Sequence, residues 1–183
     1  SILSPFCGTC EFCLSGHMSV CHTQNGDVFR RGESDPPRLS VGDTPVSQFL
    51  HLSSFAERLL VHENALCKID PEMPMDRACL IGCGVITGVG SVFHAAQVRP
   101  GSTVAVIGCG GVGLSTINGA DIAGAGRIIA VDLEPQKLAL ARKFGATDTV
   151  NASEGDPVEQ VRELTGGGVD FAFEAIGLKT TAD

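Results

Sequence analysis

The fold of this chain is decided by the stretch TVAVIGCGGVG, which occupies residues 103–113. Its first five residues form an apolar, largely β-branched run that is typical of a buried strand. The glycine-rich run that follows the strand then opens a helical stretch, and its members are Gly108, Cys109, Gly110, Gly111, Val112 and Gly113. A G-x-G-x-x-G run between a strand and a helix is typical of a loop that binds a dinucleotide pyrophosphate at the helix N-terminus. The alternative is a plain glycine turn.

Each glycine in the pattern has a separate physical role. Gly108 permits the tight turn after the strand, Gly110 lets the backbone approach a pyrophosphate, and Gly113 allows the helix to pack closely on the strand. Nineteen residues past Gly113, the next apolar run ends in Asp132. A carboxylate at that point accepts hydrogen bonds from ribose hydroxyls and repels a 2′-phosphate, so the sequence favours NAD over NADP. Lys137 is close enough in sequence to reach the same ribose, although a solvated helix lysine fits the spacing as well.

Strands and helical stretches alternate from residue 103 onward. We predict strands at 103–107, 127–131, 148–150 and 169–174, and helices at 112–123, 135–144 and 158–164. This alternation indicates βαβ units and therefore an α/β fold with a Rossmann-type parallel sheet. The N-terminal part lacks the rhythm: we expect a strand at 56–62 and a helical pattern over 76–98 that is interrupted by glycines. We therefore divide the chain into domains 1–85 and 86–183.

Four of the eight cysteines fall within the first 21 residues, at Cys7, Cys10, Cys13 and Cys21. Three thiols spaced by two residues, with a fourth on the returning loop, can converge on one tetrahedral centre. Four thiolates close the coordination shell of zinc, which makes such a site structural rather than catalytic. An iron–sulfur cluster uses related spacing but places its fourth cysteine differently, and disulfides are the remaining alternative. His17 and His22 lie close by but are not needed as ligands.

A third motif places Cys83 between two glycines, followed by Thr87. Bare backbone on both sides leaves the sulfur accessible, although a small packed residue explains the pattern as well. The remaining cysteines and lone histidines are expected to be structural; they are Cys67, Cys79, Cys109, His51, His62 and His94.

Composition and charge exclude several classes of protein. With 13 basic and 21 acidic side chains the formal net charge is −8, which argues against binding to nucleic acid. No charged and then apolar leader opens the chain, so we expect no signal peptide and a cytoplasmic location. The uncharged runs 78–98 and 102–120 are long enough to span a bilayer, but their glycines favour buried turns and strands, and we expect no membrane partner.

Taken together, these motifs resemble those of the zinc-dependent alcohol dehydrogenases of the medium-chain dehydrogenase/reductase superfamily. The resemblance runs through essentially all 183 residues. It implies that the four clustered cysteines bind a structural zinc in a partial GroES-like, β-rich catalytic domain. It also implies that Cys83 is a ligand of the catalytic zinc, that Thr87 lies near the nicotinamide, and that residues 108–113, Asp132 and Lys137 bind NAD. Because relatives acting on polyols often carry Glu in place of the Cys83 thiolate, the chain looks closer to the branch that oxidises alcohols and the thiol adduct of formaldehyde.

The resemblance implies a reaction, and it also implies that this chain covers only part of the family's pattern. It implies hydride transfer from a small alcohol to NAD, giving an aldehyde or ketone, in a homo-oligomer. The family's other catalytic-zinc ligands and its proton relay lie upstream of the cysteine lobe, and its last coenzyme-domain strands lie further downstream. We therefore expect an internal fragment with two incomplete domains that is inactive by itself. The alternative is a non-catalytic zinc-lobe protein whose Rossmann domain senses NAD, and a nucleic-acid-binding zinc ribbon is disfavoured by the charge.

Overall fold

The computed structural model describes residues 6–21, 35, 38–46 and 55–182. The chain divides into two compact units, Ser1–Ala78 and Cys79–Asp183, and each is described by itself. Predicted features that fall on residues 22–34 or 47–54, including His22 and His51, lie outside the described residues.

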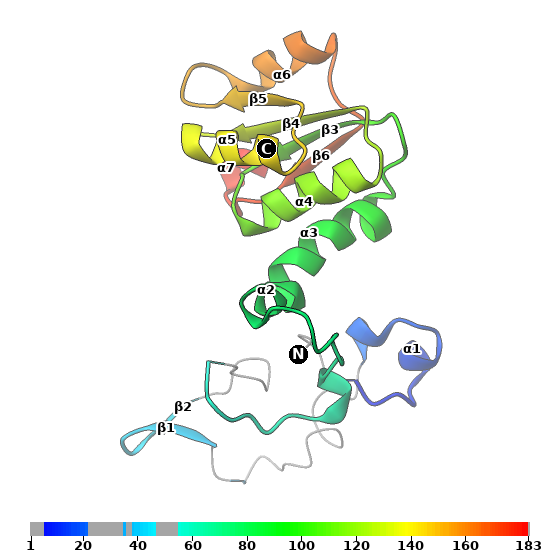
Figure 1. Ribbon diagram of the computed structural model, residues 1–183, viewed down its shortest axis with the longest axis vertical. Coiled ribbons are helices and arrows are strands. Elements are labelled where there is room, and N and C mark those ends of the chain that lie inside the picture. The colour runs from blue at the N-terminus through cyan, green and yellow to red at the C-terminus, as the bar shows by residue number, and fades with distance from the viewer. Residues whose placement is uncertain (1–5, 22–34, 36–37, 47–54, 183) are drawn as a thin grey trace. The chain divides into compact units, whose positions relative to one another are not determined.

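The second unit is built on a four-stranded parallel sheet (Figure 1). Its strands are β3 (Thr103–Ile107), β4 (Arg127–Asp132), β5 (Asp148–Asn151) and β6 (Phe171–Glu174), in the spatial order β5-β4-β3-β6. The register pairs Thr103 with Arg127 and Val104 with Phe171. All four predicted strands and their parallel arrangement are confirmed.

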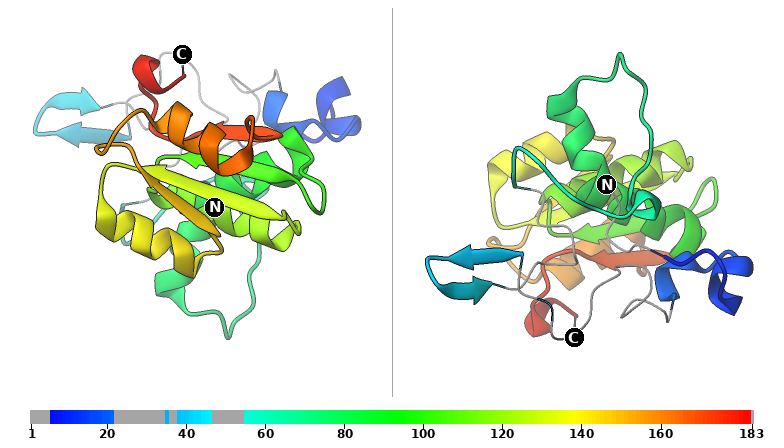
Figure 2. Two further views of the ribbon diagram at one scale, coloured as in Figure 1. Left: turned by 90° about the horizontal axis from the view of Figure 1, so that it is seen from above. Right: turned by 90° about the horizontal axis from the view of Figure 1, so that it is seen from below.

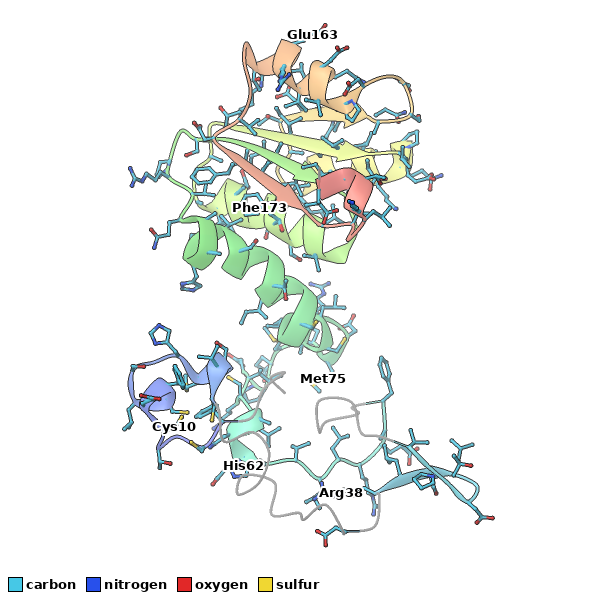
Figure 3. The ribbon with its side chains drawn as sticks, turned by 180° about the vertical axis from the view of Figure 1, so that it is seen from behind. Cys10, Arg38, His62, Met75, Glu163 and Phe173 are labelled. Carbon is cyan, nitrogen blue, oxygen red and sulfur yellow. The ribbon has the colours of Figure 1, made fainter. Side chains whose placement is uncertain are left out.

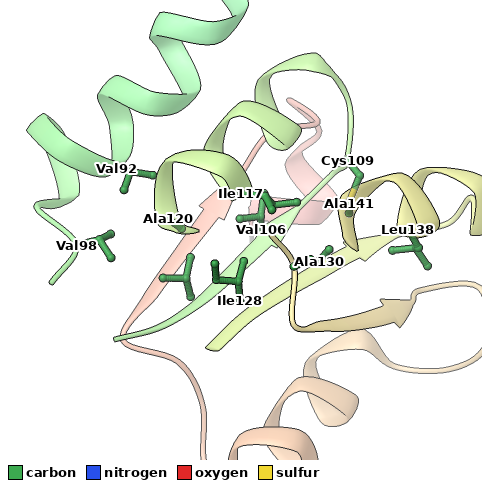
Figure 4. Packing of buried hydrophobic residues seen from close by; sticks show 12 residues of the cluster. Val92, Val98, Val106, Cys109, Ile117, Ala120, Ile128, Ala130, Leu138 and Ala141 are labelled. Carbon is green, nitrogen blue, oxygen red and sulfur yellow. The ribbon is translucent and has the colours of Figure 1, made fainter. Parts of the chain in front are cut away.

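Helices connect the strands and cover both faces of the sheet, as Figure 2 shows from two sides. They are α4 (Gly111–Ile122), α5 (Pro135–Lys143), α6 (Pro157–Thr165) and the short α7 (Lys179–Ala182). The larger apolar core lies between the sheet and α4 and α5 (Figure 4), and it includes Val104, Val106, Ile117, Ile128 and Leu138. A smaller cluster of Ile129, Val131 and Val150 packs against Val161 of α6 on the opposite face. Successive strand residues thus alternate between two covered faces, as expected for a parallel sheet.

The strand order reverses between β3 and β6. From β3 the chain moves through α4 to β4 and through α5 to β5, and after α6 it returns to the other side of β3. In open parallel sheets, ligands bind at such a reversal, beyond the carboxyl ends of the strands. The loop 108–110 leaves β3 at that point, so the topology places the glycine motif where a dinucleotide would bind.

One helical segment, Met75–Ala96, precedes the sheet. It consists of α2 (Met75–Leu80), the π-helix η4 (Ile81–Val85), α3 (Ile86–Gly90) and the π-helix η5 (Ser91–Ala96). It ends at Gln97, whose φ of 53° is left-handed. The predicted interruptions at the glycines are wrong: Gly82 and Gly84 lie in the π-helical turn η4 and Gly88 and Gly90 in α3, and the helix continues through all four.

The same segment corrects the expectation that 78–98 forms buried turns and strands. Within the described part of the chain it is the one helix that is long and apolar enough to cross a membrane, with a mean hydropathy of 1.7 and 11% of that window buried. A single such helix is weak evidence, because core helices of soluble proteins pass the same test. Residues 102–120, by contrast, divide into β3 and α4.

The first unit contains short elements. They are α1 (Glu11–Leu14), η1 (Met18–Val20), the hairpin strands β1 (Leu39–Val41) and β2 (Thr44–Val46), and η3 (Glu63–Ala65). The strand predicted at 56–62 is wrong, since residues 55–62 are bends and extended chain without a sheet partner among the described residues. Apolar side chains there, including Phe55 and Leu60, are exposed, so the apolar pattern does not reflect burial.

Candidate functional site: a four-cysteine centre and a dinucleotide loop

The four N-terminal cysteines converge on one point. The Sγ atoms of Cys7, Cys10, Cys13 and Cys21 all lie within 4.8 Å of one another. Individual separations are 3.4 Å for Cys10–Cys13, 3.7 Å for Cys7–Cys21, 3.8 Å for Cys10–Cys21 and 3.9 Å for Cys7–Cys13. A regular tetrahedron with zinc–sulfur bonds of about 2.3 Å has sulfur–sulfur edges of about 3.8 Å. The four sulfurs therefore fit one zinc ion.

The competing explanations fit less well. A disulfide joins its sulfurs at about 2.05 Å, and no disulfide joins any of these four cysteines. In a four-iron cluster each thiolate binds its own iron, which would hold the sulfurs further apart than the edges of a single-metal tetrahedron. His17 does not enter the centre, because its Nδ1 lies 3.2 Å from Ser15 Oγ in an exposed turn.

Local backbone geometry holds the cysteines in place. The single turn α1 carries the chain from Cys10 to Cys13, and the backbone N–H groups of Thr9 and Cys10 donate to Cys7 Sγ at 3.4 and 3.3 Å. Such N–H donors stabilise a thiolate ligand once a metal is bound. Without a metal, burial and the neighbouring sulfurs raise the pKa of the Cys13 thiol to about 12. Zinc binding therefore releases protons from this cluster.

The lobe is tied to the rest of its unit by a polar contact. Asn64 Nδ2 donates to the carbonyl of Phe6 at 2.6 Å, directly before Cys7. His62 caps η3 by accepting the Asn64 N–H at its Nδ1 (3.1 Å), which confirms the structural role expected for this histidine. Figure 3 shows Cys10 and His62 in this unit.

The glycine motif forms a tight loop with open backbone at its centre. Gly108 has a φ of +96°, and a Cβ on it would lie 2.6 Å from Ile176 Cγ1. A Cβ on Gly113 would lie only 1.8 Å from the Gly108 carbonyl oxygen, so the helix packs directly on the turn. Gly110 and Gly111 are exposed, and nothing lies within 4 Å of a Cβ placed on either. The geometry leaves room for a pyrophosphate where the first N–H groups of α4 have no partner within their own helix.

Asp132 ends β4 beside this loop and is 9% exposed. Its Oδ2 accepts the Cys109 N–H at 2.8 Å, its Oδ1 accepts the Glu134 N–H at 3.0 Å, and Lys137 Nζ lies 3.8 Å from Oδ1. The carboxylate therefore supports the glycine loop in addition to standing at the position expected for ribose recognition. Burial and the Asp132 charge raise the pKa of the Cys109 thiol to about 11, so this cysteine is protonated at neutral pH.

Cys83 and Thr87 lie four residues apart on the Met75–Ala96 helix, and both are exposed. Side chains four residues apart share one face of a helix. Among the described residues, the four lobe cysteines form the only group of three or more metal-type ligands, and Cys83 is not part of one. The Cys83 thiol is thus exposed, and within residues 6–21, 35, 38–46 and 55–182 it belongs to no group of three or more metal-type ligands.

Sequence reasoning missed one residue at this edge of the sheet. Glu174, at the end of β6, accepts hydrogen bonds from the N–H groups of Ile176 and Gly177 and from the Thr181 hydroxyl. The Thr181 hydroxyl and these N–H groups lower the pKa of the Glu174 carboxyl. The carboxylate shapes the turn that packs on Gly108. An acidic residue three positions before a glycine was the available signal, since such side chains often accept from a following turn.

The chain is similar in sequence to several known proteins. Residues 111–183 match the family model described as zinc-binding dehydrogenase. The chain is 45% identical over 177 residues to an S-(hydroxymethyl)glutathione dehydrogenase of Synechocystis sp. and 44% identical over 179 residues to an alcohol dehydrogenase class-3 of Myxine glutinosa. The matches cover 93% and 94% of this chain and 47% of each relative. The chain therefore spans about half the length of the curated relatives it matches.

Solved structures of alcohol dehydrogenases have a similar fold. An alcohol dehydrogenase zinc-binding domain protein from Burkholderia ambifaria has a TM-score of 0.84 at 39% identity, over 99% of this chain and 50% of that one. Benzyl alcohol dehydrogenase from Acinetobacter calcoaceticus has a TM-score of 0.81 at 36% identity, over 98% of this chain and 49% of that one.

The chain has an α/β fold like that of solved zinc-binding alcohol dehydrogenases, with a parallel sheet and a four-cysteine cluster. It is homologous to part of class-3 alcohol dehydrogenase and of S-(hydroxymethyl)glutathione dehydrogenase, over about half of their length.

Proposed function

We propose that this chain forms part of an oxidoreductase that transfers a hydride from a small alcohol to NAD and yields an aldehyde or ketone. The supporting observation is the buried Asp132 carboxylate, which lies 2.8 Å from the N–H of Cys109 within the glycine loop. This arrangement presents a pyrophosphate-binding loop and an acidic ribose acceptor side by side. The names of the relatives, S-(hydroxymethyl)glutathione dehydrogenase and alcohol dehydrogenase class-3, agree with an alcohol or a thiol adduct of formaldehyde as substrate.

Different residues of the chain would bind the dinucleotide and the two zinc ions. The N–H groups at the start of α4 would bind the pyrophosphate, and Asp132 would accept hydrogen bonds from the adenosine ribose, with Lys137 beside it. Cys83 would supply one thiolate to a catalytic zinc, and Thr87, on the same helix face, would lie beside the nicotinamide. When bound, zinc acts as a Lewis acid that favours the alkoxide form of the alcohol, and NAD accepts the hydride. The four-cysteine centre would hold a second, structural zinc with no open coordination position.

We propose in addition that the 183-residue chain is inactive by itself, and that the full-length enzyme is a cytoplasmic homo-oligomer. One thiolate holds a metal weakly, and Cys83 has no companion ligands among the described residues. Elemental analysis should find one firmly bound zinc per 183-residue chain. Alcohol-dependent NADH formation by this polypeptide would contradict its inactivity. A longer native chain that binds NAD but holds one zinc would favour the alternative of a non-catalytic NAD sensor.

Selectivity for NAD provides the direct test. Isothermal titration calorimetry suits this chain, which contains no Trp or Tyr for fluorescence. The wild-type chain should bind NAD more tightly than NADP, because the carboxylate repels the 2′-phosphate. Asp132→Gly should shift the ratio of NADP to NAD affinity toward NADP by about tenfold. It should also lower the affinity for both dinucleotides, because the N–H groups of Cys109 and Glu134 lose a charged hydrogen-bond acceptor that contributes about 1.5–3 kcal/mol.

Asp132→Asn is the matched control. It keeps an oxygen that can accept from Cys109 but removes the charge. We expect it to shift the NADP-to-NAD ratio while preserving more NAD affinity than Asp132→Gly does. An unchanged ratio in both variants would exclude a ribose-selecting role for Asp132.

A further inference from the structure

The helix that carries Cys83 and Thr87 meets the dinucleotide-binding helix α4 at Gly88. Gly88 is buried, and a Cβ placed on it would lie 2.6 Å from three atoms of α4: Ser115 Cβ, the Thr116 backbone N and the Val112 carbonyl oxygen. Two of these are backbone atoms, which cannot move aside to relieve a clash as the end of a flexible side chain can. In an α-helix the N–H of one residue bonds to the carbonyl four residues earlier. Gly88 therefore packs directly on a hydrogen bond of the first turns of α4.

A second glycine, on α4, also allows the two helices to lie close together. A Cβ on Gly119 of α4 would lie 3.2 Å from Val89 Cα and 3.3 Å from Val92 Cγ2. Val92 is fully buried in this contact, and its side chain is visible beside α4 in Figure 4. Gly90, on the same helix as Gly88, has open space instead. The tight contact is thus confined to particular positions and is not a general property of the glycines in this segment.

Helix α4 is also held on its opposite side. The Gly113 backbone is so close to Gly108 that no Cβ fits between them, and Ile117 and Ala120 are fully buried against the sheet. A side chain added at position 88 would therefore displace the Cys83 helix and leave α4 in place.

We propose that Gly88 is a positioning residue that sets the separation between the helix carrying Cys83 and Thr87 and the helix that binds the pyrophosphate. The inference rests on the proposed function, in which Thr87 lies beside the nicotinamide. Thr87 directly precedes Gly88 in the chain, so any displacement at Gly88 reaches Thr87 without attenuation. The pyrophosphate site, built from β3, α4 and β4, does not depend on this spacing.

The test compares two ligands in the Gly88→Ala variant by isothermal titration calorimetry. ADP-ribose contains the adenosine, the pyrophosphate and the second ribose but lacks nicotinamide. We expect the affinity for ADP-ribose to stay within about twofold of wild type while the affinity for NAD falls by about tenfold, which corresponds to about 1.4 kcal/mol. Gly90→Ala is the matched control: its Cβ enters open space on the same helix, and both affinities should be unchanged.

The outcomes separate this inference from the function on which it rests. An equal loss of NAD and ADP-ribose affinity would show that Gly88 supports only the fold or the phosphate site, and unchanged NAD affinity would show that it positions nothing; either result overturns the inference. A wild-type chain that binds neither ligand overturns the proposed function as well. If Gly88→Ala does not fold, Gly119→Ala provides a milder displacement at the same contact, and its NAD affinity should fall less but again without loss of ADP-ribose binding. If that variant shows no loss specific to NAD, the inference is overturned.

Discussion

The cysteine lobe and the parallel sheet are stabilised by different physical means. Between residues 6 and 21, Cys21 is the one buried residue, and side chains such as Leu14 and Val20 are largely exposed. On the two faces of the sheet, fully buried residues of the strands and of α4, such as Val104, Ile117 and Ile129, form two apolar cores. We therefore expect the lobe to depend on a metal, as small domains with too little core do, whereas the sheet depends on apolar burial.

This difference explains why the two regions appear so differently in the sequence. Metal ligands need particular residue types at particular spacings, and the residues between them are free to be polar. A buried strand needs only apolar, β-branched residues in a row. Perturbing one region should leave the other intact, and the following experiments test that independence.

The largest effect is expected when a thiolate is removed from the lobe. Structural zinc contributes about 10–16 kcal/mol of binding free energy in zinc-finger peptides. Cys10→Ser should therefore lose the zinc and unfold residues 6–21, while the thermal unfolding midpoint of the sheet stays near that of wild type. Elemental analysis and amide hydrogen exchange of the lobe measure the two outcomes.

Cys67→Ser is the matched control, because Cys67 is an exposed thiol whose Sγ contacts only the Lys68 carbonyl among the interactions described for it. It should keep a full equivalent of zinc. If Cys10→Ser also kept a full equivalent of zinc at unchanged affinity, the four sulfurs would not be the zinc site.

The next effect concerns the core of the sheet. Ile117 is fully buried on α4, and truncating a buried isoleucine to alanine costs about 2–5 kcal/mol. Ile117→Ala should lower the free energy of unfolding by that amount in urea titrations followed by circular dichroism, with the zinc content unchanged. Ile122→Ala, on the same helix but at a position 65% exposed, should change it by less than about 0.5 kcal/mol. A loss of zinc in Ile117→Ala would show that the two regions are coupled.

Sequence reasoning was reliable where one residue type has one structural consequence. The buried strands follow from continuous apolar runs, and the cysteine centre follows from spacing. The sequence does not predict one continuous helix over Met75–Ala96, because its glycines are typical helix breakers, although an internal glycine costs only about 1 kcal/mol. At Gly88 the missing side chain is what allows α4 to approach.

The other misjudgements have a common cause. Residues 56–62 have an apolar pattern, but a strand exists only where a second strand pairs with it, and no local pattern encodes that partner. The hairpin of β1 and β2 was overlooked although its Gly42-Asp43 turn, with Gly42 at a φ of +58°, is a recognised hairpin signal. The roles of Cys83 and Thr87 rest on the family resemblance and stay predictions, because no group of three or more metal-type ligands among the described residues includes Cys83.

The smallest effect concerns the pH dependence of the sheet's stability. Arg127 Nε donates to Asp148 Oδ2 at 2.9 Å between β4 and β5, and this hydrogen bond, together with that of Thr147, lowers the pKa of the Asp148 carboxyl below its usual 3.8. A carboxyl with a lowered pKa stabilises the folded state above its unfolded pKa, and that stabilisation is lost as the pH falls through the folded value. Because the two side chains are 37% and 25% exposed, we expect at most about 1 kcal/mol.

Asp148→Asn should therefore destabilise the sheet at pH 7, and its difference from wild type should shrink as the pH falls below the unfolded pKa of the Asp148 carboxyl and through its lower folded pKa. The measurement is the free energy of unfolding by urea at pH 7, 4 and 2, taken as the difference between variant and wild type so that zinc loss from the lobe at low pH cancels. Glu163→Gln removes an exposed acidic charge from α6 and should give a difference that does not change with pH over this range. A difference for Asp148→Asn that is equally independent of pH would show that the ion pair contributes nothing to the sheet. In that case apolar burial alone would distinguish the sheet from the metal-dependent lobe.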